Sequence, residues 1–151
     1  MTPRDLAIAV IGAGPAGLRA AQALAEAGLR PVLIDEQATP GGQIYRKPPA
    51  PLRALRNPQA LYGRDWRRAQ ALDDMLKALA GRIDTRMETL VWNAQACDTG
   101  FRLFLRNPDG RDETLDVAAL ILATGAMDRI LPVPGWTAPG VWSLGGAQVM
   151  L

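Results

Sequence analysis

The sequence predicts an α/β fold, namely a Rossmann-like three-layer dinucleotide-binding domain that carries an antiparallel β-meander. Short apolar runs with few polar interruptions, at Leu6–Ile11, Val32–Ile34 and Ala119–Ala123, indicate buried strands. An alanine-rich helical pattern joins the first two runs, and several short strand-like segments separated by turn residues precede the third. With 151 residues, of which 48% are hydrophobic, the chain has enough apolar side chains for one core.

The glycine-rich segment VIGAGPAG lies where the first strand passes into a helix that begins near Pro15. In a GxGxxG turn at this position, Gly12 allows the tight turn and Gly14 lets a ligand phosphate approach the backbone. Gly17 lets the helix pack closely against the strand. The free amides and the positive dipole end of the helix then attract phosphates, so the pattern predicts a dinucleotide site.

The helical pattern continues to Gly28, a residue that readily adopts the left-handed backbone conformation that ends helices. The strand that follows ends in Asp35 and Glu36. A carboxylate about 20 residues beyond the glycines accepts hydrogen bonds from a ribose diol in folds of this type. The alternative is a glycine-rich loop followed by solvated acids, for which the strand-turn-helix-strand context is a poor match.

A loop rich in glycine and proline, at 38–51, follows the acids. Gly41, Gly42 and Gln43 follow a few residues beyond the ribose acid, close to where a ligand pyrophosphate and the part of the ligand beyond it would lie. An ordinary turn explains these residues equally well at this level.

The next segment predicts one helix over Ala60–Ala80, in which Trp66 faces the core or an interface and Gly81 ends the helix. Alternating residues then predict the strands of the meander, with a turn at 107–110; the expected strands are Ile83–Met87, Thr89–Ala94, Phe101–Arg106 and Thr114–Val117.

After the meander, the run at 119–123 predicts a central parallel strand that is covered on both faces and ends in Thr124 and Gly125. Its carboxyl end would share one edge of the sheet with Gly12 and Asp35, where ligands bind in open α/β sheets. The sequence therefore predicts that these corners form one site.

Several kinds of chemistry are excluded by what the chain lacks. It contains no histidine, which rules out histidine-dependent triads, acid-base catalysis and metal sites within this chain. Cys97 is the one cysteine, so a CxxC pair, an intrachain disulfide or a cysteine-ligated cluster cannot form, and we expect Cys97 to be a small packed residue. No metal site is expected.

The net charge is only +2, and the densest basic group, Arg64, Arg67 and Arg68, indicates a solvated helix face rather than a nucleic-acid site. No apolar run has the length of a membrane span, and the N-terminus lacks the pattern of a signal peptide, so we expect a cytoplasmic protein.

Taken together, the motifs VIGAGPAG, LIDE, PGGQIYR, LILATGAMDRILPVPGW and APGVWSLGGAQVML resemble the FAD-binding part of two-dinucleotide-domain flavoproteins of the pyridine nucleotide-disulphide oxidoreductase type. The chain is most similar to the alpha-type subunits of opine oxidase or octopine dehydrogenase, to the hydrogen cyanide synthase subunit, and to heteromeric hydroxyproline, proline or sarcosine dehydrogenases. The resemblance implies FAD as cofactor, partner subunits, and oxidation of an amine or opine.

The resemblance also implies roles for individual residues. The backbone of the glycine turn would hold the pyrophosphate, Asp35 would bind the adenosine ribose with Glu36 in reserve, and Leu90 would contact adenine. The residues implied in FAD binding are Gly12, Gly14, Pro15, Ala16, Gly17, Asp35, Glu36, Gly42, Gln43, Leu90, Thr124 and Gly125. No residue stands out as a catalytic acid or base, and Arg129 would face either the flavin or a surface acid.

The chain lacks the CxxC of thioredoxin reductase-like relatives and a second GxGxxG. We therefore expect residues 1–151 to be the N-terminal FAD-binding portion of a longer flavoprotein, with Leu144–Leu151 opening a helix that leads to a second dinucleotide domain. Two alternatives remain. One is an NAD(P)-binding dehydrogenase domain, and the other is a non-catalytic assembly subunit with Trp66, Trp136 and Trp142 as contact candidates.

Overall fold

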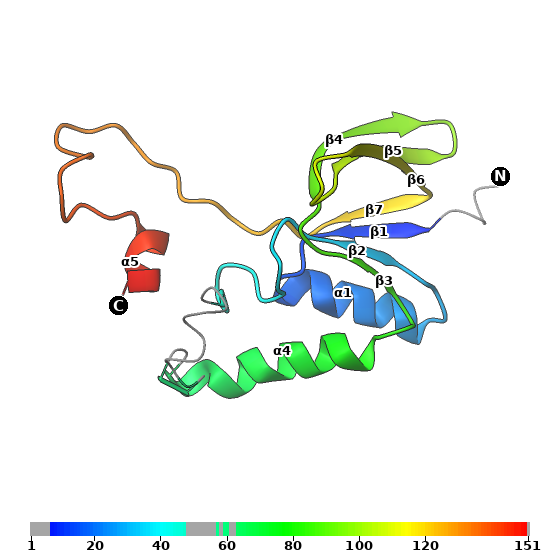
Figure 1. The fold of residues 1–151 in the computed structure, drawn as a ribbon, viewed down its shortest axis with the longest axis horizontal. Coiled ribbons are helices and arrows are strands. Elements are labelled where there is room, and N and C mark those ends of the chain that lie inside the picture. Colours follow the sequence, from blue (N-terminus) through cyan, green and yellow to red (C-terminus); the bar gives the residue numbers. More distant parts are fainter. Residues whose placement is uncertain (1–6, 48–56, 58, 61–62, 151) are drawn as a thin grey trace.

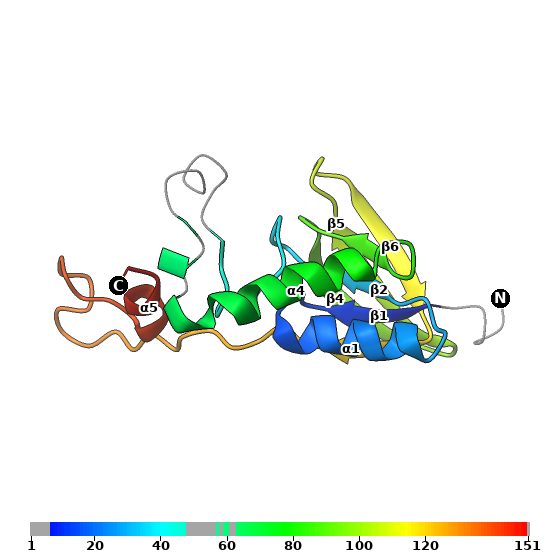
Figure 2. The same ribbon diagram turned by 90° about the horizontal axis from the view of Figure 1, so that it is seen from below.

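The protein is described by a computed structural model for residues 7–47, 57, 59–60 and 63–150. It has three layers, since two helices cover one face of a parallel sheet and an antiparallel sheet covers the other (Figures 1 and 2). The predicted fold class is confirmed. In chain order the elements are β1 (Ile8–Ile11), α1 (Pro15–Glu26), β2 (Val32–Ile34), the 3-10 turn η2 (Gly63–Asp65), α4 (Trp66–Ala78), β3 (Asp84–Arg86), β4 (Leu90–Cys97), β5 (Gly100–Arg106), β6 (Asp112–Val117), β7 (Ala119–Leu122) and α5 (Leu144–Met150).

The β1-α1-β2 unit forms in the predicted order, but β1 begins at Ile8 instead of Leu6. Ala7 precedes the strand, and Leu6 lies outside the described residues. Pro15 occupies the first turn of α1, where its missing N–H costs nothing. The helix ends at Glu26, and Gly28 follows it with a φ of 80°, which allows Leu29 N to donate to Leu24 O at 3.0 Å. These local signals return the chain to β2, which pairs parallel to β1.

Alternate residues of the two inner strands face opposite layers, which explains why their sequences are apolar throughout. Val10 and Leu33 pack with the helices, whereas Ala9 and Ile34 pack with the antiparallel sheet. Each of these four side chains is fully buried. The two hydrophobic clusters thus hold the parallel sheet between its covering layers.

The helix expected over Ala60–Ala80 is shorter than predicted. Gly63, with a φ of 53°, begins η2, and the α-helix α4 starts only at Trp66. Residues 61 and 62 of the expected helix lie outside the described residues. Leu72 and Leu79 are buried against the helix-side cluster, and Gly81 follows with a φ of 77°. Trp66 is half-buried, and Cζ of Arg67 lies over its ring, 5.8 Å from the ring centroid.

The assignment of Ile83–Met87 to the meander was wrong. Strand β3 lies in the main sheet, whose order is β3-β2-β1-β7, and pairs parallel to β2 with Leu33 opposite Thr85. Helix α4 carries the chain across one face of the sheet, so the strand that follows it can only return in the same direction as β2 (Figure 1).

The antiparallel sheet therefore contains three strands in the order β4-β5-β6. Strand β4 begins one residue later than predicted and runs on to Cys97, which is exposed; the expectation of a packed cysteine was wrong, because this end of the strand extends into solvent. A register shift at Trp92 turns its ring onto Phe104, with centroids 5.2 Å apart.

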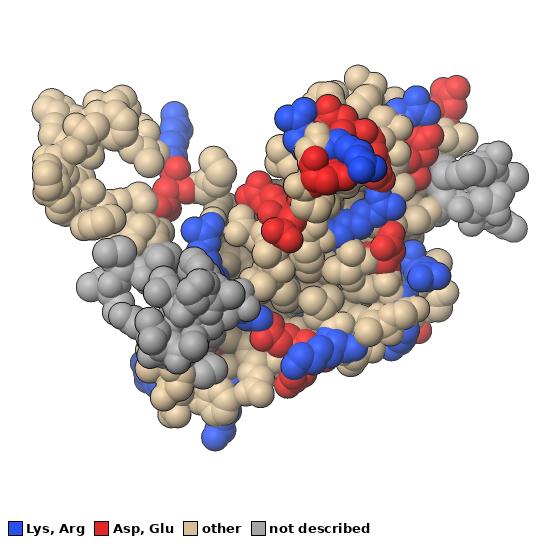
Figure 3. All heavy atoms as spheres, viewed as in Figure 1, with Lys and Arg blue, Asp and Glu red and all other residues tan. Residues whose placement is uncertain are grey.

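Charged pairs cover the outer face of this sheet. Arg102 and Arg106 each donate two hydrogen bonds to the opposite carboxylate, Asp116 and Asp112 respectively, and these bonds lower the pKa of both carboxyls. In Figure 3, Lys and Arg alternate with Asp and Glu over this part of the surface. The group Arg64, Arg67 and Arg68 is also exposed, as expected for a solvated helix face.

Strand β7 occupies an edge of the described parallel sheet, not the centre that the sequence predicted. It pairs parallel to β1, with Val10 opposite Ile121, but Leu122 is 70% exposed. An apolar sequence shows that a strand can be buried on both faces, but its actual burial depends on which other segments pack beside it.

From Ala123 to Ser143 the chain extends away from the three layers and ends in α5 (Figure 1). The helix matches the expected Leu144–Leu151 as far as Met150, and Leu151 lies outside the described residues. Asp128 links this extended segment to the start of α5 by accepting hydrogen bonds from the Ser143 side chain and from Gly145 N, the latter at 2.7 Å. Both hydrogen bonds lower the pKa of the Asp128 carboxyl. Trp136 and Trp142 are exposed along it.

Candidate functional site

The glycine turn lies against the end of β7 and leaves no room for side chains. A Cβ at Gly12, whose φ is 104°, would come within 2.3 Å of Ala123 O. Gly12 N also donates to Ile34 O at 2.7 Å, which ties the turn to the end of β2. Only glycine satisfies both the positive φ and the close contact.

Gly14 and Gly17 have separable roles. A Cβ at Gly17 would meet Gly12 O at 1.8 Å, so Gly17 allows the helix to approach the turn, and it does not line the pocket described below. A Cβ at Gly14 would lie 3.7 Å from Gly42 Cα, an ordinary contact. Gly14 faces the pocket and is not needed for packing within the chain.

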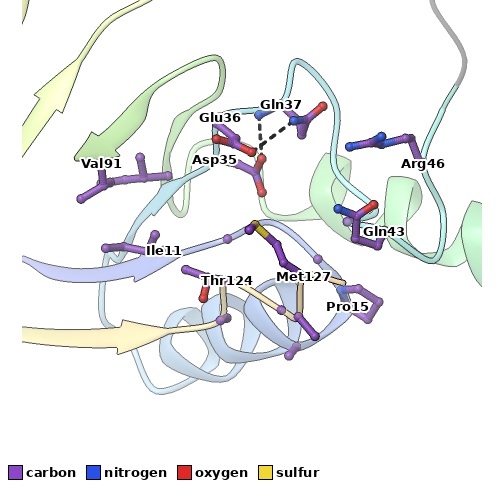
Figure 4. A pocket seen from close by; sticks show the side chains of 18 of the residues that line it. Ile11, Pro15, Asp35, Glu36, Gln37, Gln43, Arg46, Val91, Thr124 and Met127 are labelled. Atoms are coloured by element: carbon purple, nitrogen blue, oxygen red, sulfur yellow. Dashed lines mark hydrogen bonds between the residues drawn. The ribbon is translucent and has the colours of Figure 1, made fainter. Parts of the chain in front are cut away.

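Asp35 connects the ends of β1 and β2. Its carboxylate accepts a hydrogen bond from Ala13 N at 2.5 Å. It accepts another from Gln37 N at 2.7 Å (Figure 4). Backbone amides thus hold this side chain beside the glycine turn, where a ligand hydroxyl can reach it. Glu36 is exposed next to it and accepts from the Gln37 amide group.

The loop GGQIYR docks directly onto the glycine turn. Gly41 N donates to Ala13 O at 3.0 Å, and Gly42, with a φ of 60°, lies against Gly14. Its far end is anchored by an ion pair between Lys47 and Asp73 of α4. The two glycine-rich segments therefore form one continuous wall, which is more than the ordinary turn considered as an alternative. Residues 48–51 of the predicted loop lie outside the described residues.

These corners surround a pocket of about 660 Å³. Asp35 and Gln43 lie above it in Figure 4, with Pro15 and Thr124 below and Val91 at one end. Of the predicted site residues only Gly17 is not among its lining residues; those present are Gly12, Gly14, Pro15, Ala16, Asp35, Glu36, Gly42, Gln43, Leu90, Thr124 and Gly125. The structure brings the predicted site together, and its role in cofactor binding remains a prediction.

Sequence reasoning missed part of the lining, namely Ile11, Ile34, Gln37, Ile44, Arg46, Thr89, Val91, Ala123, Ala126 and Met127. Most of these residues are next in sequence to residues that were predicted, so their position beside a motif could have identified them as lining residues. Arg129 does not line the described pocket.

The charged groups of the pocket are few. Asp35, Glu36 and Arg46 are its only ionisable side chains among the described residues. No three cysteine or acidic residues in the described parts of the chain are grouped so that they could hold a metal ion. Such a lining can bind and orient a polar, elongated ligand, while reaction chemistry would have to come from that ligand.

A parallel sheet with a GxGxxG turn at the strand-to-helix corner and an acid on the neighbouring strand defines a dinucleotide-binding α/β domain. Comparison with known proteins narrows this class. Residues 6–145 match the pyridine nucleotide-disulphide oxidoreductase family, and the chain belongs to this family.

The relatives confirm the predicted resemblance. The chain is 39% identical over 142 residues to the HcnB subunit of hydrogen cyanide synthase from Pseudomonas aeruginosa, covering 94% of this chain and 29% of that protein. It is 33% identical over 165 residues to one of the opine oxidase subunits of Agrobacterium tumefaciens, covering 100% of this chain and 32% of that protein. The chain thus spans less than a third of these curated relatives, both of which are named as subunits.

Solved structures share the fold. L-proline dehydrogenase from P. horikoshii superposes with a TM-score of 0.65 at 23% identity, over 83% of this chain and 24% of that one. Bacillithiol disulfide reductase from Bacillus cereus gives a TM-score of 0.65 at 21% identity, over 89% and 44% respectively. None of the helices in the described part of the chain has the length and apolar character needed to cross a membrane.

Proposed function

We propose that this chain binds FAD in extended form along the pocket and forms the dinucleotide-binding portion of an FAD-dependent oxidoreductase subunit. The observation that carries the proposal is the meeting of four separate segments, namely the glycine turn, Asp35, the GGQIYR loop and Thr124–Gly125, around one cavity. Family membership supports a redox cofactor, because the family is described as oxidoreductases, and FAD is the cofactor that the resemblance of the motifs implies.

The lining fits the parts of an adenine dinucleotide in order. Leu90 and Val91 provide an apolar end for adenine, and the α1 amides beside Gly14 suit the diphosphate. An ionised carboxylate has about four acceptor sites. Two sites on Asp35 are occupied by backbone amides, which leaves the others for a ribose diol.

When bound, the flavin would supply the redox chemistry, and the chain would bind it, orient it and exclude water from part of it. We propose a secondary amine or opine as the substrate class of the whole enzyme, since a curated relative carries the name opine oxidase. The naming of the curated relatives as subunits supports partner subunits for this chain also. Continuation of the reading frame into a second dinucleotide domain and a cytoplasmic location remain predictions.

The test is a titration of the chain with FAD, followed by flavin fluorescence, on wild type and Gly14→Ala. The added methyl group contacts Gly42 only at an ordinary distance, and the backbone at Gly14, with a φ of −70°, accepts alanine. The variant should keep the wild-type unfolding midpoint and bind FAD at least about tenfold more weakly, because the methyl group fills the diphosphate position.

Failure of the wild-type chain to bind FAD would contradict the proposal. Preferential binding of NAD in competition would favour the dehydrogenase alternative. If the assembled enzyme keeps full activity and flavin content with Gly14→Ala, the glycine turn does not hold the cofactor and the scaffold alternative gains.

A further inference from the structure

We infer that Arg46 is the cationic residue that binds the diphosphate of the dinucleotide. The inference rests on the proposed function and adds a binding residue that the GxGxxG pattern does not contain. Among the described lining residues Arg46 carries the one positive side chain, whereas Asp35 and Glu36 carry negative charge at the ribose position. The amides at the start of α1 attract the phosphates, and a positive side chain near them adds further stabilisation.

The neighbours of Arg46 fix its position. Tyr45 packs against the helix-side core, and its backbone N donates to Gly41 O at 3.2 Å. On the other side, the Lys47 ammonium pairs with Asp73 of α4, and both side chains are largely buried, with 19% and 31% exposed. With Tyr45 directed to the core and Lys47 to α4, the backbone at Arg46 is held on both sides while its side chain borders the pocket.

Figure 4 places Arg46 above Gln43, on the side of the pocket where Pro15 begins α1 and opposite the end marked by Val91. Gly42, four residues earlier in the chain, lies against Gly14 of the phosphate-binding turn. The Arg46 side chain therefore borders the pocket on the loop whose Gly42 contacts the phosphate-binding turn, on the rim across from the start of α1. A guanidinium presents planar paired donors that match phosphate oxygens, so it complements amides that approach from the opposite side.

The experiment measures FAD affinity at several salt concentrations for Arg46→Gln, Arg46→Lys and the control Arg111→Gln. Arg111 is 83% exposed and pairs with Asp109 in a turn of the antiparallel sheet, so its replacement removes the same charge away from the pocket. We expect Arg46→Gln to bind FAD roughly 10- to 100-fold more weakly at low salt, the range for a hydrogen bond between charged groups.

Arg46→Gln should also reduce the salt dependence of FAD binding, because one charge pair fewer is screened. Arg46→Lys should retain much of that salt dependence while binding more weakly than wild type, which a purely structural role would not produce. Unfolding midpoints identify any loss of folding.

The inference is overturned if Arg46→Gln matches Arg111→Gln in affinity and salt dependence, or if Arg46→Lys and Arg46→Gln have the same salt dependence. Either result leaves the FAD proposal intact, provided that the wild-type chain binds FAD. Absence of FAD binding by wild type instead overturns the proposed function, and this inference with it.

Discussion

Gly17→Ala should destabilise the fold without placing any atom in the pocket. The added Cβ would lie 1.8 Å from Gly12 O, whereas Cβ atoms essentially never come closer than 3.0 Å to such an atom. Helix α1 and the glycine turn must therefore separate by about 1.2 Å, and Ala123 Cβ, at 3.3 Å, restricts movement in another direction.

Forcing an extra methyl group into packed structure costs about 1–3 kcal/mol, and the higher end applies because the contacted atom belongs to the backbone. Alanine gains up to about 1 kcal/mol over glycine within a helix, which leaves a net loss of about 2 kcal/mol. For a chain of this length the unfolding midpoint should fall by about 4–8 °C.

Thermal unfolding followed by circular dichroism measures this loss, with Gly28→Ala as the control. A Cβ at Gly28 would meet no other atom, so Gly28→Ala destabilises the fold only because alanine must adopt a φ of 80°, at a cost of about 1–2 kcal/mol. The steric reasoning is refuted if Gly17→Ala is as stable as the wild type. Gly14→Ala should differ from both by keeping stability and losing FAD affinity.

Three further predictions concern other contacts. Hydrogen bonds from Asn107 and Arg86 lower the pKa of the Glu113 carboxyl. The ionised carboxylate therefore stabilises the fold fully above the unfolded-state pKa of about 4.5, and this stabilisation is lost as pH falls through the lower folded-state pKa. Glu113→Gln should weaken the dependence of the unfolding free energy on pH between about 5 and 2, and an unchanged dependence contradicts this. Asp73→Asn removes the carboxylate that pairs with Lys47. The unfolding free energy in urea titrations should fall by about 1–2 kcal/mol, which lies between the values for exposed and buried ion pairs. A loss near zero would mean that this pair does not anchor the loop. Cys97 should react fully with a thiol reagent in the native protein, and labelling only after unfolding would show that it is covered.

Local patterns predicted those elements whose signals lie within the elements themselves. The β1-α1-β2 unit was predicted because Pro15, Gly28 and the apolar runs act over a few residues. The parallel pairing of β3 was missed, since Asp84–Arg86 is three residues long and half-exposed. Its partner is decided by the path of α4, a contact distant in sequence.

The sequence by itself determined the order of strand, glycine turn, acid and second glycine loop, because each is encoded by residue type and short spacing. Only the tertiary structure separated Gly14, which faces the pocket, from Gly17, which packs on Gly12, and placed Arg46 at the pocket beside an inward-facing Tyr45. It also put β7 at an edge and left Cys97 exposed. The physical reason is that a residue's conformational preference is local, whereas burial and contact depend on chain segments brought together only by packing of the whole domain.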